Sequence, residues 1–323
     1  VDGETFRFMG QSADAEIKQI YSDLSALVTD YVFENEKIVL HLSFYSTLFP
    51  DDLYRLSRPI SYLKINYESN DGKEHKVSVN ISATEELCIN KAGETPVLAQ
   101  SVELGDGSFA EKIGSVYQKM LGRSGDVLRI EWGYFYFCGP NGSEYKSFEE
   151  DGKTVISASF PLEEGVCSDL LFAYDDIKCL NYFGTNVDAY WKTKGLSMEQ
   201  ALVEAKNESG EMLEKCRKIS EELFDDAENA GGEKYAELLE LSYRQLIAAH
   251  KLAVDTEGQI IFISKECLSN GCAATVDVTY PSAPFFMLYS PELLKGMLRP
   301  IFKYAESDDW KYDFAPHDIG TYP

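Results

Sequence analysis

Hydrophobic and polar positions alternate in the first half of the chain as they do in half-buried strands. The clearest case is 76-KVSVNIS-82, where Val77, Val79 and Ile81 fall on one face, because successive side chains of a strand point to opposite sides. Turn-forming residues separate this run from others like it. The other runs are 31–44, 60–67, 127–137 and 154–160, and the turn signals are 70–72, 105–107, 139–142 and 150–152. The pattern predicts antiparallel sheets that each bury one face.

From about residue 196 the spacing of apolar residues changes to that of a helix. Ser197 and Gln200 form a capping-box pattern, because each side chain can satisfy a backbone amide of the other residue. An apolar stripe follows from Met212 to Ala227, and Gly231-Gly232 ends the helix. A second helix is expected from 233 to about 254. Its apolar residues surround most of its circumference, which predicts a buried helix packed against the first.

The last quarter of the chain predicts a long decorated loop and one more helix. Residues 259–263 form a short strand-like run, an irregular stretch extends through Pro284, and Ser290-Pro291 marks the start of a helix over 292–303. Paired helices joined by long loops are typical of a helical toroid. We therefore predict an α+β multidomain fold, with an N-terminal antiparallel β-sandwich followed by the first part of an (α/α)6 six-hairpin barrel. The expected divisions are a sandwich over 1–165, a connecting segment over 166–195 and a truncated helical domain over 196–323.

The net charge of the chain limits the classes of partner that it can bind. The chain of 323 residues has 30 Lys and Arg against 54 Asp and Glu, a net charge of -24. Such a field repels nucleic acid and anionic membrane surfaces, and no stretch predicts a membrane span or a signal peptide. The absence of an initial Met and the abrupt end at Pro323 suggest a fragment or a processed form. The expected partner is a small-molecule substrate, and the oligomeric state stays open.

Seven cysteines are present, and none of their spacings is a CxxC. With only four histidines, the sequence predicts no metal site and no cofactor. No GxSxG elbow is present, so His317-Asp318 does not indicate a serine triad. Buried free thiols are the ordinary interpretation of the cysteines, as a core histidine is of His250.

Polar and aromatic residues concentrate in five segments where a purely structural loop would not need them. The segments are 174–184 with 188–191, 243–251, 264–271, 275–284 and 314–323. The candidate acids in these segments are Asp175, Asp176, Glu266, Asp277 and Asp318. For Asp175-Asp176 a solvated turn is an equally good interpretation, and Glu266 beside Lys265 could be a surface pair. Asp277 lies between two valines, so strand alternation would turn it to solvent or to a pocket.

The same five segments carry a resemblance. The stretches LLFAYDDIKCLNYFGTNVDAYW, SKECLSNGCAATVDVTYPSAP and WKYDFAPHDIGTYP, with DGETFRFMGQ and RIEWGYFYF upstream, resemble the glutaminase A family. The resemblance implies a β-sandwich-like domain ahead of a six-helical-hairpin domain, and a secreted or periplasmic hydrolase that releases ammonia from glutamine. The family's hairpin domain continues beyond the point where this chain ends.

With no nucleophile elbow and no zinc motif, a carboxylate pair is the simplest means of activating water and protonating ammonia. We expect Asp318 and Glu266 in these roles, Asp175 or Asp176 on the substrate amino group, and Arg244 or Lys265 on its carboxylate. The remaining candidate contacts are Asn270, Tyr280, His317 and Tyr322. Two alternatives remain: a glycoside hydrolase-like six-hairpin enzyme, by analogy of fold alone, and a non-catalytic β module.

Overall fold

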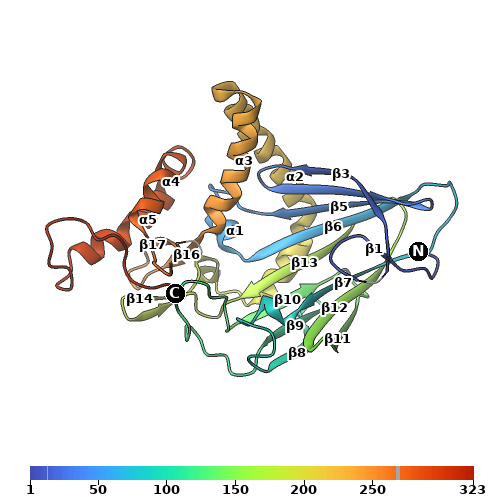
Figure 1. Cartoon of the computed structure of the whole chain (residues 1–323), viewed down its shortest axis with the longest axis horizontal. Helices are drawn as coiled ribbons and strands as arrows, with labels where there is room; N and C mark the ends of the chain where they lie inside the picture. The colour runs from blue at the N-terminus through green and yellow to red at the C-terminus, as the bar shows by residue number, and fades with distance from the viewer. Residues whose placement is uncertain (13, 267–269) are drawn as a thin grey trace.

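The computed structural model describes residues 1–12, 14–266 and 270–323, in which an antiparallel β-rich region is followed by helices (Figure 1). An eight-stranded sheet dominates the β-rich region, and its strand order is β3-β4-β5-β6-β13-β10-β9-β8. Its strands are β3 (Lys18–Leu24), β4 (Val28–Glu34), β5 (Ile38–Ser46), β6 (Ile60–Ser69), β8 (Val97–Glu103), β9 (Phe109–Ser115), β10 (Tyr134–Cys138) and β13 (Ser168–Asp175). A three-stranded sheet contains β7 (Val77–Thr84), β11 (Glu144–Glu150) and β12 (Lys153–Leu162).

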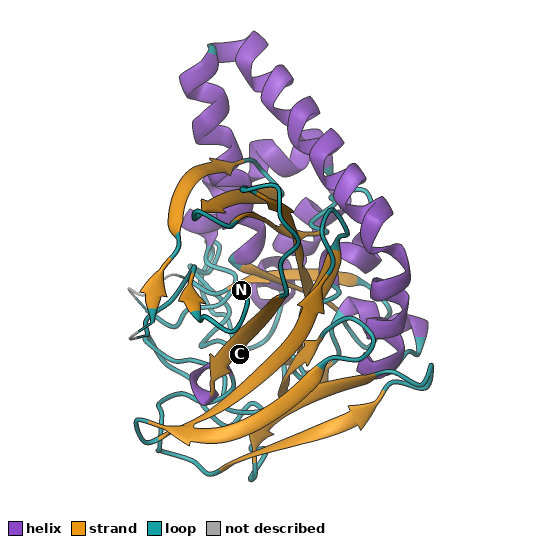
Figure 2. Cartoon of the chain, turned by 90° about the vertical axis from the view of Figure 1, so that its right-hand side faces the viewer, coloured by secondary structure: helices purple, strands orange, loops and turns teal. Residues whose placement is uncertain are grey.

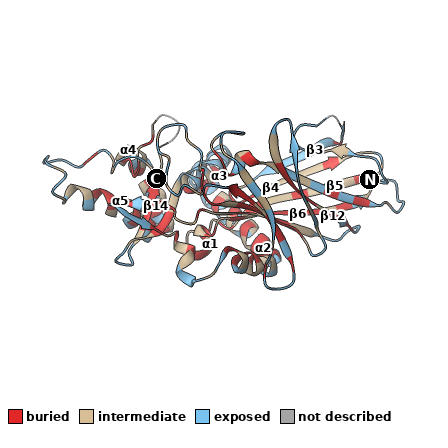
Figure 3. Cartoon of the chain, turned by 90° about the horizontal axis from the view of Figure 1, so that it is seen from below, coloured by how far each residue is buried: buried red, intermediate tan, exposed pale blue. Residues whose placement is uncertain are grey.

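Alternate residues of β13 contact two different hydrophobic cores. Leu170 lies in the core between the two sheets, together with Val79 of β7. Leu171 and Ala173 lie in the core on the opposite face of the large sheet, which a long helix covers. The centre of the large sheet is therefore buried on both faces, whereas the edge strand β3 is exposed; Figure 3 shows the burial colours of these strands. This double burial explains why β13 is apolar at consecutive positions.

The β-rich region extends past residue 165. Strand β13 lies between β6 and β10 in the large sheet, although residues 166–195 were expected to form a connecting segment. The run 31–44 is a hairpin of β4 and β5, and only the last part of 127–137 is a strand, because β10 begins at Tyr134. Gly133 has a φ of 84°, and a Cβ there would lie 2.2 Å from the Asp175 carbonyl oxygen. This close approach ends the strand on its N-terminal side.

Several short elements complete the β-rich region. They are β1 (Phe6–Arg7), β2 (Ala15–Glu16), α1 (Leu53–Ser57), β14 (Leu180–Tyr182) and β15 (Thr185–Val187), with 3₁₀ turns over Glu85–Leu87 and Tyr190–Lys194.

Helix α2 (Met198–Gly231) begins at the predicted capping box. The Gln200 backbone amide donates to Ser197 Oγ, and the Ser197 amide donates to Gln200 Oε1. The helix ends at Gly231 with Gly232 as its C-cap, as Gly231-Gly232 predicted, and its apolar stripe packs on the large sheet. Figure 2 shows α2 and the next helix beside the sheet as one long hairpin.

We expect Ser197→Ala to lower the free energy of unfolding by about 1 kcal/mol, because it removes the acceptor for an otherwise unpaired backbone amide. Urea unfolding followed by circular dichroism measures this change. Ser197→Asp keeps an acceptor at the cap and serves as the control, so an equal loss in both variants would contradict the capping role.

Helix α3 (Glu233–Ala248) ends earlier than predicted. The expected helix extended to about 254, but β16 (His250–Val254) pairs there with β17 (Ile260–Ser264). The Asp255 side chain accepts from the amides of Glu257 and Gln259 and so fixes the turn between these strands. The prediction of burial on most sides was also wrong, since Leu238 is 60% exposed. One face of α3 packs on α2 and the sheet, and the other has no cover among the described residues.

Helix α4 (Val276–Tyr289) occupies the stretch that was expected to be irregular, although it contains Pro281 and Pro284. Phe286 is fully buried against Phe262 and His250, and this packing outweighs the two missing backbone donors. Helix α5 (Pro291–Ala305) starts with Pro291 in its first turn, as predicted. Ser290 is the N-cap, but its side chain makes no capping hydrogen bond within the described residues.

Charged groups join the β-rich region to the helices. Arg217 of α2 contacts Asp30 of β4 through two hydrogen bonds of 2.7 and 2.9 Å, and buried Arg58 contacts Glu208 of α2. Arg244 of α3 donates to the Ala26 carbonyl and to Thr29 Oγ1. Of the cysteines, Cys267 lies outside the described residues and the other six are free thiols. The described helices include none with the length and apolarity needed to cross a bilayer.

Candidate functional site

Backbone hydrogen bonds bring three polar segments together at the C-terminal end of the chain. The Ala273 amide donates to the Gly320 carbonyl, and the Ile319 amide donates back to the Ala273 carbonyl. The Val276 amide at the start of α4 donates to the His317 carbonyl. These bonds fix the loop 314–323 beside residues 270–276, and the Glu266 amide joins the same layer through the Cys272 carbonyl.

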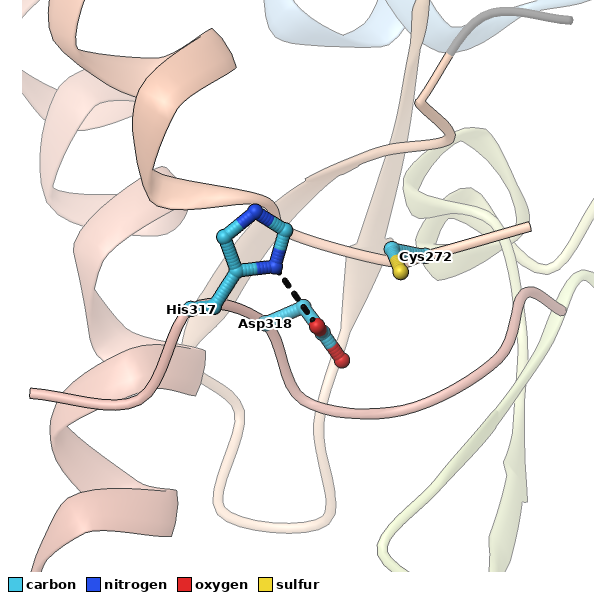
Figure 4. A group of neighbouring side chains, drawn as sticks. All are labelled: Cys272, His317 and Asp318. Carbon is cyan, nitrogen blue, oxygen red and sulfur yellow. Dashed lines mark hydrogen bonds and ion pairs between the residues drawn. The ribbon is translucent and has the colours of Figure 1, made fainter. Parts of the chain in front are cut away.

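His317 and Asp318 form an ion pair on this loop (Figure 4). His317 Nδ1 lies 2.8 Å from Asp318 Oδ2, and because a carboxylate only accepts, Nδ1 must carry the proton. This hydrogen bond raises the pKa of His317 above its ordinary value. Burial alone would raise the pKa of Asp318, but bonds from His317, the Gly320 amide and Cys272 outweigh it and lower that pKa. Asp318 therefore stays ionised and holds the imidazole in one orientation.

The opposite edge of the imidazole, which carries Nε2, lies near two more carboxylates. His317 Nε2 lies 3.7 Å from Asp277 Oδ1 in the first turn of α4. One atom each from Glu266, Asp277 and His317 lie within 4.8 Å of one another. Glu266 is oriented by Thr275, whose hydroxyl donates to Oε2 at 3.1 Å. We call Glu266, Asp277, His317 and Asp318 the loop cluster.

Cys272 extends the loop cluster on the Asp318 side. Its Sγ, one atom of His317 and one of Asp318 also lie within 4.8 Å of one another, and Cys272 is half-buried on the neighbouring segment (Figure 4). Burial and the adjacent Asp318 raise the pKa of this thiol. Both groups, one centred on Glu266 and one on Cys272, contain donor atoms that a divalent ion such as zinc accepts.

A cavity of about 130 Å³ lies beside the loop cluster and is lined in part by Asp176, Lys251, Lys265 and Tyr322. Asp176 Oδ2 pairs with Lys251 Nζ at 2.8 Å, and the Asp176 side chain is only 5% exposed. Burial raises the pKa of Tyr322 to about 12, so its hydroxyl stays protonated. Lys265 Nζ donates to the Asp126 carbonyl of the β-rich region. The loop 123–132 thus forms one wall of this cavity.

Four residues that the sequence predicted for the site lie outside the loop cluster. Asp175 pairs with Lys192 at 2.8 Å and accepts from the Ile177 amide. Arg244 donates to Ala26 and Thr29 of the β-rich region and makes none of the contacts of the loop cluster. Its position therefore does not support the expectation that it binds substrate. Asn270 accepts from the Cys272 amide and shapes the turn. Tyr280 lies on α4 and is 82% exposed.

Sequence reasoning missed three residues that shape this region. Thr275 and Cys272 contact the proposed acids, and Lys251 offsets the charge of Asp176. The signal for Lys251 is its place in an apolar run, 251-KLAV-254, where a lysine needs a partner. The signal for Thr275 is weaker: it lies two residues before Asp277. The only signal for Cys272 is that it lies close to the candidate acids in the sequence.

Two family models match the chain, and together they account for both halves of the fold. The model described as "Domain of unknown function (DUF5127)" matches residues 28–169, and the one described as "Glutaminase A six helical-hairpin domain" matches residues 232–323. The second match contains the whole loop cluster. The chain therefore has a β-rich region followed by a segment that matches the model of a six-hairpin domain.

Two curated relatives are similar to most or all of this chain. Glutaminase A of Aspergillus oryzae is 28% identical over all of this chain and 51% of its own length. A "Probable glutaminase" of Arthroderma benhamiae is 24% identical over 89% of this chain and 38% of its own. Together, the family model over residues 232–323 and these two relatives support the assignment of the chain to the glutaminase A family. The chain spans about half the length of the first relative and less of the second.

One solved structure, "Putative kojibiose phosphorylase from human microbiome", aligns with 90% of this chain and 36% of its own, with a TM-score of 0.49 and 12% sequence identity. A likeness of this size carries no argument about activity.

Proposed function

We propose that this protein is a hydrolase that releases ammonia from the side-chain amide of L-glutamine, and that the loop cluster does the chemistry. The observation that carries the proposal is that one atom each of Glu266, Asp277 and His317 lie within 4.8 Å of one another, and that His317 is also hydrogen-bonded to Asp318. An activated water and a proton donor are the two needs of amide hydrolysis. The relatives named as glutaminases support the choice of amide.

In the proposed mechanism, Glu266 accepts a proton from water while the water oxygen attacks the amide carbon. The C–O bond forms and the C=O electrons move to oxygen, which gives a tetrahedral intermediate. His317, whose protonated form is favoured by its hydrogen bond to Asp318, then donates its Nε2 proton to the amide nitrogen. The C–N bond breaks and its electrons leave with ammonia. The proton held by Glu266 restores His317, which balances the cycle.

This assignment changes one role expected from the sequence. The general acid is His317 and not Asp318, because the lowered pKa of Asp318 leaves no proton to donate. Asp318 becomes a positioning residue that fixes the imidazole tautomer. Asp175 and Asp176 each have a lysine partner at 2.8 Å, so Asp277 is the better candidate for the substrate ammonium group. Lys265 remains the candidate for its carboxylate.

The finer architecture and the location of the protein belong to the same proposal. The α2–α3 hairpin and the six-hairpin model over 232–323 support the first part of an (α/α)6 barrel. A secreted or periplasmic location follows only from the family resemblance. The proposed partner is a small amino acid amide, with no nucleic acid.

The pH dependence of kcat/KM tests the role of the His317–Asp318 pair. A general acid works only while it is protonated, so the rate should fall as the pH rises through the pKa of His317, which lies above the ordinary 6.5. In Asp318→Asn the hydrogen bond to a charged acceptor is lost, the pKa of His317 falls, and the declining limb should move to lower pH. Asp308→Asn, at an exposed position in the same region, is the matched control. An unmoved limb in Asp318→Asn would exclude His317 as the acid.

Oxygen-isotope labelling tests the proposed reaction itself. In a single turnover with L-glutamine in H₂¹⁸O, direct attack by water places one ¹⁸O in the side-chain carboxylate of glutamate. Unlabelled glutamate in the first turnover would show that an enzyme carboxylate attacks the substrate instead. If no glutamate forms, the proposed function is wrong.

A further inference from the structure

The cavity of about 130 Å³ beside the loop cluster combines apolar walls with a positively charged lining. Because one water needs only about 10–15 Å³, the space admits a small organic ligand. Its charged lining consists of four cations and one carboxylate: Arg123, Arg129, Lys251, Lys265 and Asp176. In a chain with a net charge of -24, this local excess of positive charge favours an anion over a cation.

Two of the four cations already pair closely with carboxylates. Lys251 Nζ lies 2.8 Å from Asp176 Oδ2, and the Asp176 side chain is buried. Arg123 pairs with both Glu94 and Glu131. These pairs offset the charges of Lys251 and Arg123, so neither cation is the first choice for binding an anionic ligand.

Arg129 is the lining cation best placed to bind an anion. Its side chain is 61% exposed, and the carboxylate that it pairs with, Glu86, lies 3.7 Å away, which is too far for a hydrogen bond. Glu86 lies much closer to Lys153, at 2.6 Å. Within the described residues the Arg129 guanidinium donates no hydrogen bond. Its planar fork of N–H donors matches the two oxygens of a carboxylate.

The loop 123–132, which carries Arg129, is anchored close to this residue. The Arg129 backbone amide donates to Asn90 Oδ1 at 3.2 Å, and Trp132 Nε1 donates to the Asp176 carbonyl at 2.8 Å. These bonds hold the Arg129 backbone at the cavity. The whole loop lies in the segment matched by the model described as a domain of unknown function, so this region would contribute directly to ligand recognition.

We propose that this cavity binds a small carboxylate on a short aliphatic chain, with the carboxylate on the Arg129 guanidinium and the chain against Leu128 and Ile130. The apolar walls favour the chain, and one guanidinium matches one negative charge. A phosphate would bring a second negative charge for which the lining has no equally available cation. The carboxylate belongs either to the substrate itself or to a separate organic acid, and both present the same chemistry to Arg129.

A titration of the intact chain with butyrate tests this site. The readout is the indole N–H resonance of Trp132, which lines the cavity and which Trp132→Phe distinguishes from those of the other two tryptophans. The matched probe is 2-pentanone, which has the same propyl chain and a carbonyl but no charge. We expect butyrate to shift the Trp132 resonance, with roughly tenfold weaker binding for 2-pentanone.

Arg129→Gln should weaken butyrate binding by about three- to tenfold, since Arg129 is largely exposed. Lys119→Gln removes the same charge at an exposed position outside the cavity lining and should bind butyrate as the unmodified chain does. Equal butyrate affinity in Arg129→Gln and the unmodified chain would overturn the proposal. Equal affinity for 2-pentanone, or an unmoved Trp132 resonance, would also overturn it.

Steady-state kinetics with L-glutamine identify the source of the carboxylate. If it is the substrate's own, butyrate raises KM without changing kcat, and Arg129→Gln raises the same KM. If it belongs to a separate acid, butyrate shifts the Trp132 resonance and leaves KM unchanged. A chain that binds butyrate but releases no ammonia would contradict the proposed function and support this site, whereas an active chain that does not bind butyrate would do the reverse.

Discussion

Glu266→Gln should lower kcat for ammonia release from L-glutamine by roughly 10²- to 10⁴-fold, the usual contribution of a general base. Glutamine has nearly the same shape as glutamate but cannot take a proton from water. Thr275 holds the Glu266 side chain in place through its hydroxyl, and an amide oxygen can accept that same bond. KM should therefore change little. A coupled glutamate dehydrogenase assay measures both constants.

The matched control for this variant is Glu306→Gln, at the exposed C-terminal end of α5. It makes the same chemical change outside the loop cluster and should leave kcat unchanged. Full activity in Glu266→Gln would remove Glu266 from the mechanism. A comparable loss in both variants would point to a general effect of charge and not to a base.

Asp176→Asn and Lys251→Met should each lower the free energy of unfolding by about 3–5 kcal/mol, since each leaves one charge without its partner. The Asp176 side chain is 5% exposed, Lys251 is 30% exposed, and their charged atoms are 2.8 Å apart. The free energy of unfolding should fall less in the double variant than in either single variant, because the double variant leaves no unpaired charge. Urea unfolding of the four proteins measures the coupling between the two residues.

This prediction also separates a structural role for Asp176 from the catalytic one first expected. If Asp176 only pairs with Lys251, the double variant should keep most of the glutaminase kcat at temperatures where it is folded. A folded double variant with a loss of kcat as large as that of Glu266→Gln would restore Asp176 to the active site.

Local patterns predicted the fold where the determining contacts lie close in sequence. The capping box of Ser197 and Gln200 depends on residues three apart, and α2 starts there. Strand β7 follows from the alternation of Val77, Val79 and Ile81. Helix α4 could not be predicted this way, because Pro281 and Pro284 oppose a helix and the burial of Phe286 depends on β17 and His250.

The candidate site could also be predicted from the sequence only in part. The described residues 270–277 and the segment 314–323 do meet, and the resemblance of their sequences to one family indicated them. Adjacent Asp175 and Asp176 diverge to different lysines, Lys192 and Lys251, which lie far along the chain. Nothing local to the pair specifies those partners. The protonation of His317 likewise depends on the geometry of its bond to Asp318, which the dipeptide alone does not fix.

The most direct test of the central claim compares two substrates of different chemistry with one protein. Ammonia released from L-glutamine and reducing sugar released from a panel of glycosides are measured under the same conditions. If the loop cluster hydrolyses a carboxamide, ammonia is released from glutamine and its rate falls in Glu266→Gln, while the glycosides stay intact. Release of sugar without ammonia, lost in the same variant, would contradict the account.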